Sequence, residues 1–244
     1  MKRFGSTFLN DVRLQWRHGF YLAAAVMLAL FALLMGQLSP ENVRWLLPVV
    51  IVNNVIVNGY YFVAGLVLLE KGEGALQAQV VTPLRPSEYL LSKAASLSLL
   101  SLAENGLLAL LLLGESAHGG WLLVGLVAGT VFFTLGGFLV VVRYETVNEY
   151  LLPSMLIVSM LTLPLLPYFG VGDVAYLSEA LYLHPLQPVL LALGAAAGAP
   201  LAAWQMVYVV SYATLSTGVV LTLARAAYVR FVRQTTVRAA GRTA

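Results

Sequence analysis

Glu104 is the ionisable residue that lies well inside an apolar stretch of the sequence, and Asn105 follows it directly. A charge near the centre of a bilayer costs on the order of 2.5–3.5 kcal/mol on insertion scales, so this carboxyl group must be neutral, paired or in contact with water. Asparagines provide further polar groups at Asn53, Asn54 and Asn58. Helices rise about 1.5 Å per residue, which puts Asn53, Asn54 and Glu104 at similar depths in antiparallel spans. We therefore expect a hydrogen-bonded cluster of these residues in the outer half of the membrane.

Two roles fit such a cluster. As a functional site, it could contact a cationic or polar substrate in a transport pathway. As a structural contact, it would join two spans through interhelical hydrogen bonds, which is a common role of asparagine in membranes. The residues alone leave both roles open.

The sequence lacks the motifs of several catalytic classes. It contains no G-x-x-x-x-G-K-[ST], no H-E-x-x-H and no G-x-S-x-G. The histidines His18, His118 and His184 are too scattered for metal-ligand spacing. The absence of cysteine excludes a disulfide framework and thiolate chemistry. We expect a chain that is not an enzyme and holds no metal or cofactor of its own.

The composition is that of a membrane protein. Of the 244 residues, 60% are hydrophobic and 10% are charged, against about 25% charged in soluble domains. These values exclude a lone soluble enzyme, a disordered protein and a nucleic-acid-binding module. At about 20 residues per span, the length holds roughly five to seven membrane helices.

We expect an all-α polytopic membrane protein with one transmembrane domain over 1–244. The apolar segments that reach span length are 20–38, 46–69, 90–113, 121–142, 150–169 and 204–224. The stretch 189–199 is too short to cross about 30 Å of hydrocarbon, so it predicts a re-entrant or surface helix within an external loop at 170–203. Three prolines in or near the fifth span predict a kink there.

The basic residues predict the orientation of the chain. Segment 1–19 places aromatic side chains on one face and arginines, together with Asp11, on the opposite face. This pattern is typical of an interfacial helix, although a merely basic tail is the alternative. With six spans, all but one of the 14 Lys and Arg residues fall on one side, and Arg44 falls on the other. Because basic residues favour the inside, we expect both termini in the cytoplasm, with 225–244 as a basic tail.

The loop at 70–89, between the second and third expected spans, has an ordered pattern. Two glycines near its start allow the chain to bend, 75–81 can form a short helix, and Thr82-Pro83 ends that helix. Such a helix could serve as a contact for a soluble partner. It could equally be an ordinary connector, and physical reasoning alone favours the connector.

The run LEKGEGALQAQVVTPLRPSEYLLSK, from Leu69 to Lys93, resembles the signature of ABC-2-type transporter permeases. In particular, it is similar to the permease group of fluoroquinolone-export ABC transporters. The runs NEYLLP at 148–153 and PLQP at 185–188 resemble further motifs of that group.

This resemblance implies a permease subunit that forms the translocation pathway as a homodimer or heterodimer, with two ABC ATPase subunits docked below it. ATP and Mg would bind in those ATPases. The segment 1–19 would be the elbow helix, and 176–199 would be an external re-entrant helix pair. The chain would lie in a prokaryotic inner membrane and export amphipathic drug-like or lipid-like small molecules, with no nucleic acid as partner.

The loop 70–89 would then hold the coupling helix that enters a groove on the ATPase. The coupling residues implied by the resemblance are Glu70, Lys71, Gly72, Glu73, Gly74, Ala75, Leu76, Gln77, Val81, Thr82, Pro83, Leu84 and Arg85. Arg143, Glu145 and Glu149, between the fourth and fifth spans, form either a second ATPase contact or an exposed charge cluster.

Two other function classes stay open. A secondary transporter driven by an ion gradient usually shows internal repeats and several intramembrane charges, whereas this sequence shows no visible repeat and one deep carboxyl group. A membrane anchor for a cytoplasmic complex is the other class, and the loop pattern alone does not exclude it.

Overall fold

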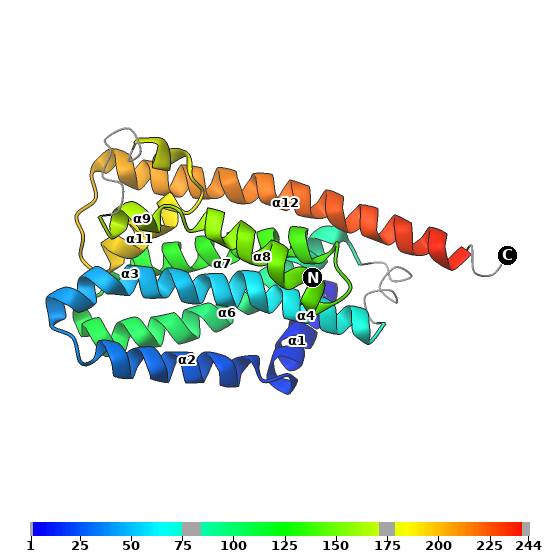
Figure 1. Cartoon of the computed structure of the whole chain (residues 1–244), viewed down its shortest axis with the longest axis horizontal. Helices are drawn as coiled ribbons and strands as arrows, with labels where there is room; N and C mark the ends of the chain where they lie inside the picture. The colour runs from blue at the N-terminus through cyan, green and yellow to red at the C-terminus, as the bar shows by residue number, and fades with distance from the viewer. Residues whose placement is uncertain (1, 75–83, 171–178, 241–244) are drawn as a thin grey trace.

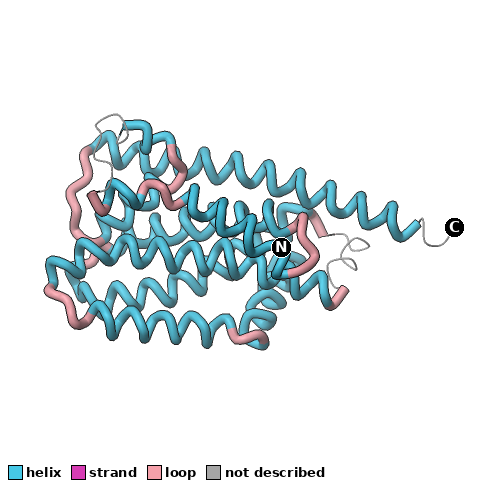
Figure 2. The backbone as a smooth tube through the Cα atoms, in the orientation of Figure 1, coloured by secondary structure: helices cyan, strands magenta, loops and turns pink. Residues whose placement is uncertain are grey.

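The computed structural model describes residues 2–74, 84–170 and 179–240, without the side chains of Lys2 and 233–240. All regular elements in these ranges are helices joined by loops, which confirms the all-α prediction for the described part of the chain (Figure 2). The expected coupling helix lies outside the described residues. The same holds for the coupling residues Ala75, Leu76, Gln77, Val81, Thr82 and Pro83.

The helices form an elongated bundle, with α1 crossing one end of it (Figure 1). In chain order they are α1 (Lys2–Arg17), α2 (Phe20–Met35), α3 (Pro40–Ile56), the π-helix η1 (Val57–Tyr61), α4 (Phe62–Gly72), α6 (Pro86–Leu113), the 3-10 turn η3 (Gly114–Ser116), α7 (Gly119–Val141), α8 (Val147–Leu161), α9 (Leu165–Tyr168), the 3-10 turn η4 (Leu181–Leu183), α11 (Gln187–Ala196) and α12 (Ala203–Ala240). We call the end where α1, the end of α4 and the start of α6 meet the charged end; it lies at the right in Figure 1.

Within the described ranges, four helical segments are long and apolar enough to cross a membrane. They are Pro40–Gly72, Pro86–Ser116, Gly119–Val141 and Ala203–Val232, and they match the expected second, third, fourth and sixth spans. The first expected span reaches this length only when α1 and α2 are combined, and that pair is bent by 63°. The count is therefore four or five, and the expected six spans stay a prediction.

The fifth expected span, 150–169, is divided between α8 and α9. Its apolar run continues through the break, but Pro164 lacks the N–H that a continuing α-helix would need. The resulting helix α8 has 15 residues, which is short for crossing the hydrocarbon core. Hydropathy therefore marks this segment as apolar without showing where its helix ends.

Local capping fixes other boundaries. α6 begins at Pro86, ahead of the expected span start at 90, because proline suits the first helical turn and Glu88 accepts a hydrogen bond from the N–H of Arg85. Gly19, at φ 77°, provides the left-handed turn that bends α1 away from α2. α12 runs through to Ala240, so the expected tail at 225–244 begins as a continuation of the last helix.

α11 is inserted into the bundle and does not lie on its surface. It packs against α7, α3 and α12, and the Val189 and Leu193 side chains are buried there. The 189–199 stretch therefore contributes apolar core from a helix of 10 residues. The other core helices are α3, η1, α4, α6 and α7, whereas only 11% of the most apolar window of α12 is buried.

Glycines allow α7 to approach η1 closely. A Cβ on Gly137 would lie 2.6 Å from the backbone oxygen of Tyr60, and a Cβ on Gly59 would lie 2.8 Å from Cβ of Phe133. Neither contact leaves room for a methyl group, so the backbones must separate if a side chain is added. The small residues thus set the distance between the helix that carries η1 and α7.

We predict that Gly137→Ala destabilises the protein by about 1–3 kcal/mol, because the added methyl group overpacks a backbone contact. The adjacent Gly136 is the matched control, since a Cβ there would meet nothing within 4 Å. Thermal unfolding of both variants in detergent measures the difference. Equal stability of Gly137→Ala and Gly136→Ala would show that this close approach does not limit the packing.

Candidate functional site

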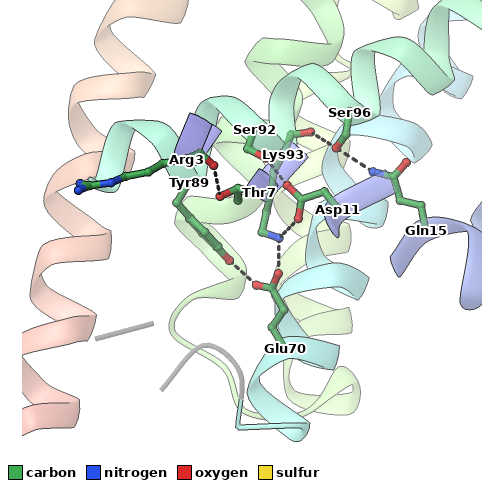
Figure 3. A network of polar contacts seen from close by, with 9 residues as sticks. All are labelled: Arg3, Thr7, Asp11, Gln15, Glu70, Tyr89, Ser92, Lys93 and Ser96. Carbon is green, nitrogen blue, oxygen red and sulfur yellow. Dashed lines mark hydrogen bonds and ion pairs between the residues drawn. The ribbon is translucent and has the colours of Figure 1, made fainter. Parts of the chain in front are cut away.

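Three buried charged side chains meet at the charged end, one each from α1, α4 and α6 (Figure 3). Nζ of Lys93 lies 3.0 Å from Oδ1 of Asp11 and 2.6 Å from Oε1 of Glu70. The side chains of Asp11 and Lys93 are 1% exposed, and that of Glu70 is 5% exposed. We call Asp11, Glu70 and Lys93 the triad.

Hydroxyl groups occupy the carboxylate oxygens that Lys93 leaves free. The Tyr89 hydroxyl donates to Oε2 of Glu70 at 2.6 Å, and the Ser92 hydroxyl donates to Oδ2 of Asp11 at 2.5 Å. Lys93 also lies over the Tyr89 ring, 4.7 Å from its centroid. A buried ion pair needs such additional hydrogen bonds to offset the cost of removing its charges from water. Each of the four carboxylate oxygens in the triad therefore accepts a hydrogen bond. Two of these bonds come from the Lys93 ammonium group, and one each comes from Tyr89 and Ser92.

A neutral contact lies beside the triad. Nε2 of Gln15 donates to the Ser96 hydroxyl at 2.8 Å, and that hydroxyl donates to the carbonyl of Lys93 at 3.1 Å. Asp11 and Gln15 lie one helical turn apart on α1, and the facing α6 residues follow the i, i+3, i+4, i+7 spacing from Tyr89 to Ser96. One face of α1 therefore meets one face of α6.

Lys71, next to Glu70, connects the end of α4 to the turn after α7. Its Nζ donates to the carbonyls of Val142 at 3.0 Å and Tyr144 at 2.6 Å, and it lies 3.8 Å from Oε1 of Glu145. The Lys71 side chain is 2% exposed and lies over the Phe231 ring of α12, 5.1 Å from its centroid. Two adjacent residues thus connect α4 to α6, to the turn after α7 and to α12.

The remaining described coupling residues are largely accessible. Glu73 is partly exposed and pairs with Arg17 at 3.4 Å and with His18 at 3.9 Å. Gly72 and Arg85 are exposed, whereas Gly74 and Leu84 are half-buried. In the turn after α7, Arg143, Glu145 and Glu149 are exposed. Oε2 of Glu149 accepts a hydrogen bond from the N–H of Glu145 at 3.1 Å.

A second hydrogen-bonded cluster lies deeper in the bundle. Nδ2 of Asn58 donates to Oε2 of Glu104 at 2.6 Å, and Nδ2 of Asn54 donates to Oδ1 of Asn105 at 3.0 Å. These four side chains are buried, but Asn53 is exposed and makes no contact with the cluster. The expected depths put Asn53 and Asn54 opposite Glu104, whereas the structure puts Asn58 there, about one helical turn along.

An apolar groove of about 490 Å³ lies between α7 and α12. Its lining residues are Leu123, Val124, Val127, Ala128, Val131, Val210, Ala213, Thr214 and Thr217. In the described ranges, no group of three or more His, Asp or Glu side chains is placed to hold a metal ion.

Comparison with known proteins gives the family. The family model described as the fluoroquinolones export permease protein family matches residues 2–236. The chain belongs to this family. Two fluoroquinolones export permease proteins of Mycobacterium tuberculosis, from strains CDC 1551 / Oshkosh and ATCC 25618 / H37Rv, are each 34% identical to it over 237 residues. These matches cover 96% of this chain and 98% of each relative.

The comparisons confirm the family suggested by the Leu69–Lys93 run, and this export permease is a multi-pass membrane protein. Sequence reasoning missed the triad in the permease. It assigned Asp11 to the polar face of the N-terminal helix and treated Lys93 only as one of the basic residues. An acidic residue on an otherwise basic helical face was the available signal, because such a group needs a partner when its helix packs against a span.

We predict that Lys93→Met destabilises the permease by about 3–5 kcal/mol, because it leaves two carboxyl groups buried without their shared cation. Adding Asp11→Asn and Glu70→Gln to Lys93→Met should recover much of the loss, since the buried charges are then gone. Denaturant titration in detergent measures both variants. A loss below about 1 kcal/mol, the range of exposed pairs, would contradict the tight burial of the triad.

We predict a coupling energy of about 0.6–1.7 kcal/mol between Asn58 and Glu104 in a double-mutant cycle, as for other interhelical hydrogen bonds in membranes. The cycle uses Asn58→Ala and Glu104→Ala, with thermal unfolding as the readout. Asn53→Ala is the matched control and should change stability by less than about 0.5 kcal/mol, because its side chain is exposed. Additive effects of the two substitutions would contradict the contact.

Proposed function

We propose that this chain is the membrane-spanning, non-catalytic subunit of an ATP-driven exporter of drug-like compounds. The observation that carries the proposal is family membership over residues 2–236, because the two relatives are named fluoroquinolones export permeases. The chain contains no P-loop, so ATP-driven transport would require that ATP be hydrolysed in another subunit. Separate ABC ATPase subunits, which would hold ATP and Mg, fit this requirement.

Two permease copies, or this chain and a paralogous permease, would form the pathway above two ATPases. The chain would lie in a prokaryotic inner membrane with both termini in the cytoplasm. This orientation is supported by the distribution of basic residues, which leaves Arg44 as the exception. The charged end of the bundle would then face the ATPases. The loop 70–89 would be the coupling loop, and Arg143, Glu145 and Glu149 would form a second contact.

The structure supports this assignment through the end of α4. Glu70 and Lys71 connect the start of the loop to α6 and to the turn after α7. Both candidate ATPase contacts therefore belong to the same packed end of the bundle. A mechanical contact with a soluble partner at this end would act on several spans together.

Fluoroquinolones are planar amphipathic compounds, and an apolar groove suits such a ligand. The groove between α7 and α12, at about 490 Å³, falls within the range of about 300–1,000 Å³ that small-molecule sites occupy. Amphipathic drugs partition into the bilayer, and the groove lies between two helices that are long and apolar enough to cross it. These features support export of drug-like or lipid-like compounds.

We predict that the chain co-purifies with an ABC ATPase co-expressed from a neighbouring reading frame. The pair, reconstituted in proteoliposomes, should transport a fluoroquinolone only when ATP is present. Vanadate, which traps ABC ATPases, should abolish transport. An ATPase variant without its Walker A lysine is the matched control.

Transport by the chain alone, driven by an ion gradient, would contradict the proposal and favour a secondary transporter. Stable binding of the ATPase without transport of drug-like or lipid-like compounds would instead favour a membrane anchor. These two outcomes correspond to the classes that the sequence leaves open.

A further inference from the structure

The triad lies on both sides of the loop that the proposed function assigns to the ATPase. Glu70 is the first residue of the loop 70–89 and lies in the last turn of α4, whereas Lys93 lies in the third turn of α6, just after the loop ends. Their side chains meet at 2.6 Å. The two ends of the loop are therefore joined by a buried ion pair, whatever conformation the chain adopts between them.

The third member of the triad comes from a distant part of the chain. Asp11, on α1, meets the same ammonium group at 3.0 Å, although 82 positions separate it from Lys93. In Figure 3, α1 lies against α6 at this point, and the Asp11 carboxylate is directed between Ser92 and Lys93. Because α1 is joined to α2 by a sharp bend at Gly19, its position depends on contacts such as this one.

The chemistry of the contact resists partial separation. If α6 moves away, two carboxylates lose their shared cation. If α1 or α4 moves away, its carboxylate leaves both the Lys93 ammonium group and the α6 hydroxyl that bind it. Either change costs more than losing a neutral hydrogen bond. The hydroxyls of Tyr89 and Ser92 fix the direction of the two carboxylates. The triad is also too buried to contact a soluble protein, so it would act through the helices that carry it.

We propose that the triad is a mechanical joint that makes α1 and both ends of the loop 70–89 move as one unit during transport. Asp11, Glu70 and Lys93 are positioning residues, and none of them touches the substrate. This inference rests on the proposed function, because the loop receives its motion from the ATPase. A displacement of the loop is then passed to α4, α6 and α1 together.

The proposal can be tested by removing the ionic contact between α1 and α6 and then linking the two helices covalently. The chain has no cysteine, so Asp11→Cys with Ser92→Cys introduces the only thiols, at two side chains that touch in the native protein. In the reduced protein, α1 loses its ionic contact with α6. A short bis-methanethiosulfonate linker then reconnects the two helices covalently without restoring the charge.

In proteoliposomes with the ATPase, the reduced variant should still bind the ATPase, but drug transported per ATP hydrolysed should fall about tenfold. Linking the thiols should restore the ratio toward the wild-type value. Wild type treated with the linker should not change. Transport per ATP that stays at the wild-type level in the reduced variant, or that the linker does not restore, would overturn the proposal.

The matched control is Gln15→Leu. It removes a buried contact between the same two helices, α1 and α6, but leaves the triad and its link to α4 intact. Transport per ATP should remain at the wild-type level. The same loss in Gln15→Leu as in the reduced double variant would mean that general α1 packing, and not the triad, is responsible.

A measurement without the ATPase separates failure of this proposal from failure of the proposed function. Spin labels at the exposed positions of Arg13 and Gly72 report the distance between α1 and the end of α4. The distance distribution should be narrow in an otherwise wild-type chain and should broaden with Asp11→Asn, which keeps the shape of the side chain. A distance distribution that Asp11→Asn leaves unchanged would overturn the proposal that the triad joins these helices, even if the protein is an ATP-driven exporter. Absence of ATPase binding by the wild type would overturn the proposed function and its role for the joint in transport, whereas a narrow distance distribution would still show that the triad holds α1 to α4.

Discussion

The contact of Lys93 with Asp11 and Glu70 determines how the charged end is arranged. An ammonium group in these surroundings needs carboxylates within about 3 Å, and only α1 and α4 provide them among the described residues. The position of α1 across the end of the bundle follows from this requirement. The left-handed glycine before α2 then provides the 63° bend that the contact demands.

Away from the charged end, single hydrogen bonds and close backbone packing replace the ion pairs. Asn58 and Glu104 join η1 to α6 through a hydrogen bond, and glycines let η1 and α7 approach until backbone and Cβ atoms touch. Such contacts rely on close packing, since lipid offers no hydrophobic force between helices. Buried ion pairs thus hold the charged end of the bundle together, and close packing holds its middle. Most of α12 lies outside this core.

The sequence predicted the features that depend on composition and local pattern. The all-helical class, the four long apolar helices and the family followed from hydropathy and from the Leu69–Lys93 run. The prolines of the fifth expected span predicted a kink, and the structure breaks the helix at Pro164. Hydropathy alone could not locate this break, because side-chain polarity does not report a missing backbone donor. A uniform rise per residue put Asn53 and Asn54 opposite Glu104, but the structure pairs Asn58 with Glu104 and Asn54 with Asn105. The register of two packed helices depends on their tilt and side-chain packing, which a residue count does not give. The helical pattern put Asp11 on a polar face without identifying the lysine that it meets.

The order of the triad along the chain has a consequence for biogenesis. Glu70 and Lys93 belong to the second and third expected spans, so they can enter the bilayer together as a hairpin whose charges compensate each other. Asp11 is synthesised long before either of them and has no partner until that hairpin is in place. The N-terminal helix α1 therefore emerges first from the ribosome, but its ionic contact forms only after α6 has been inserted.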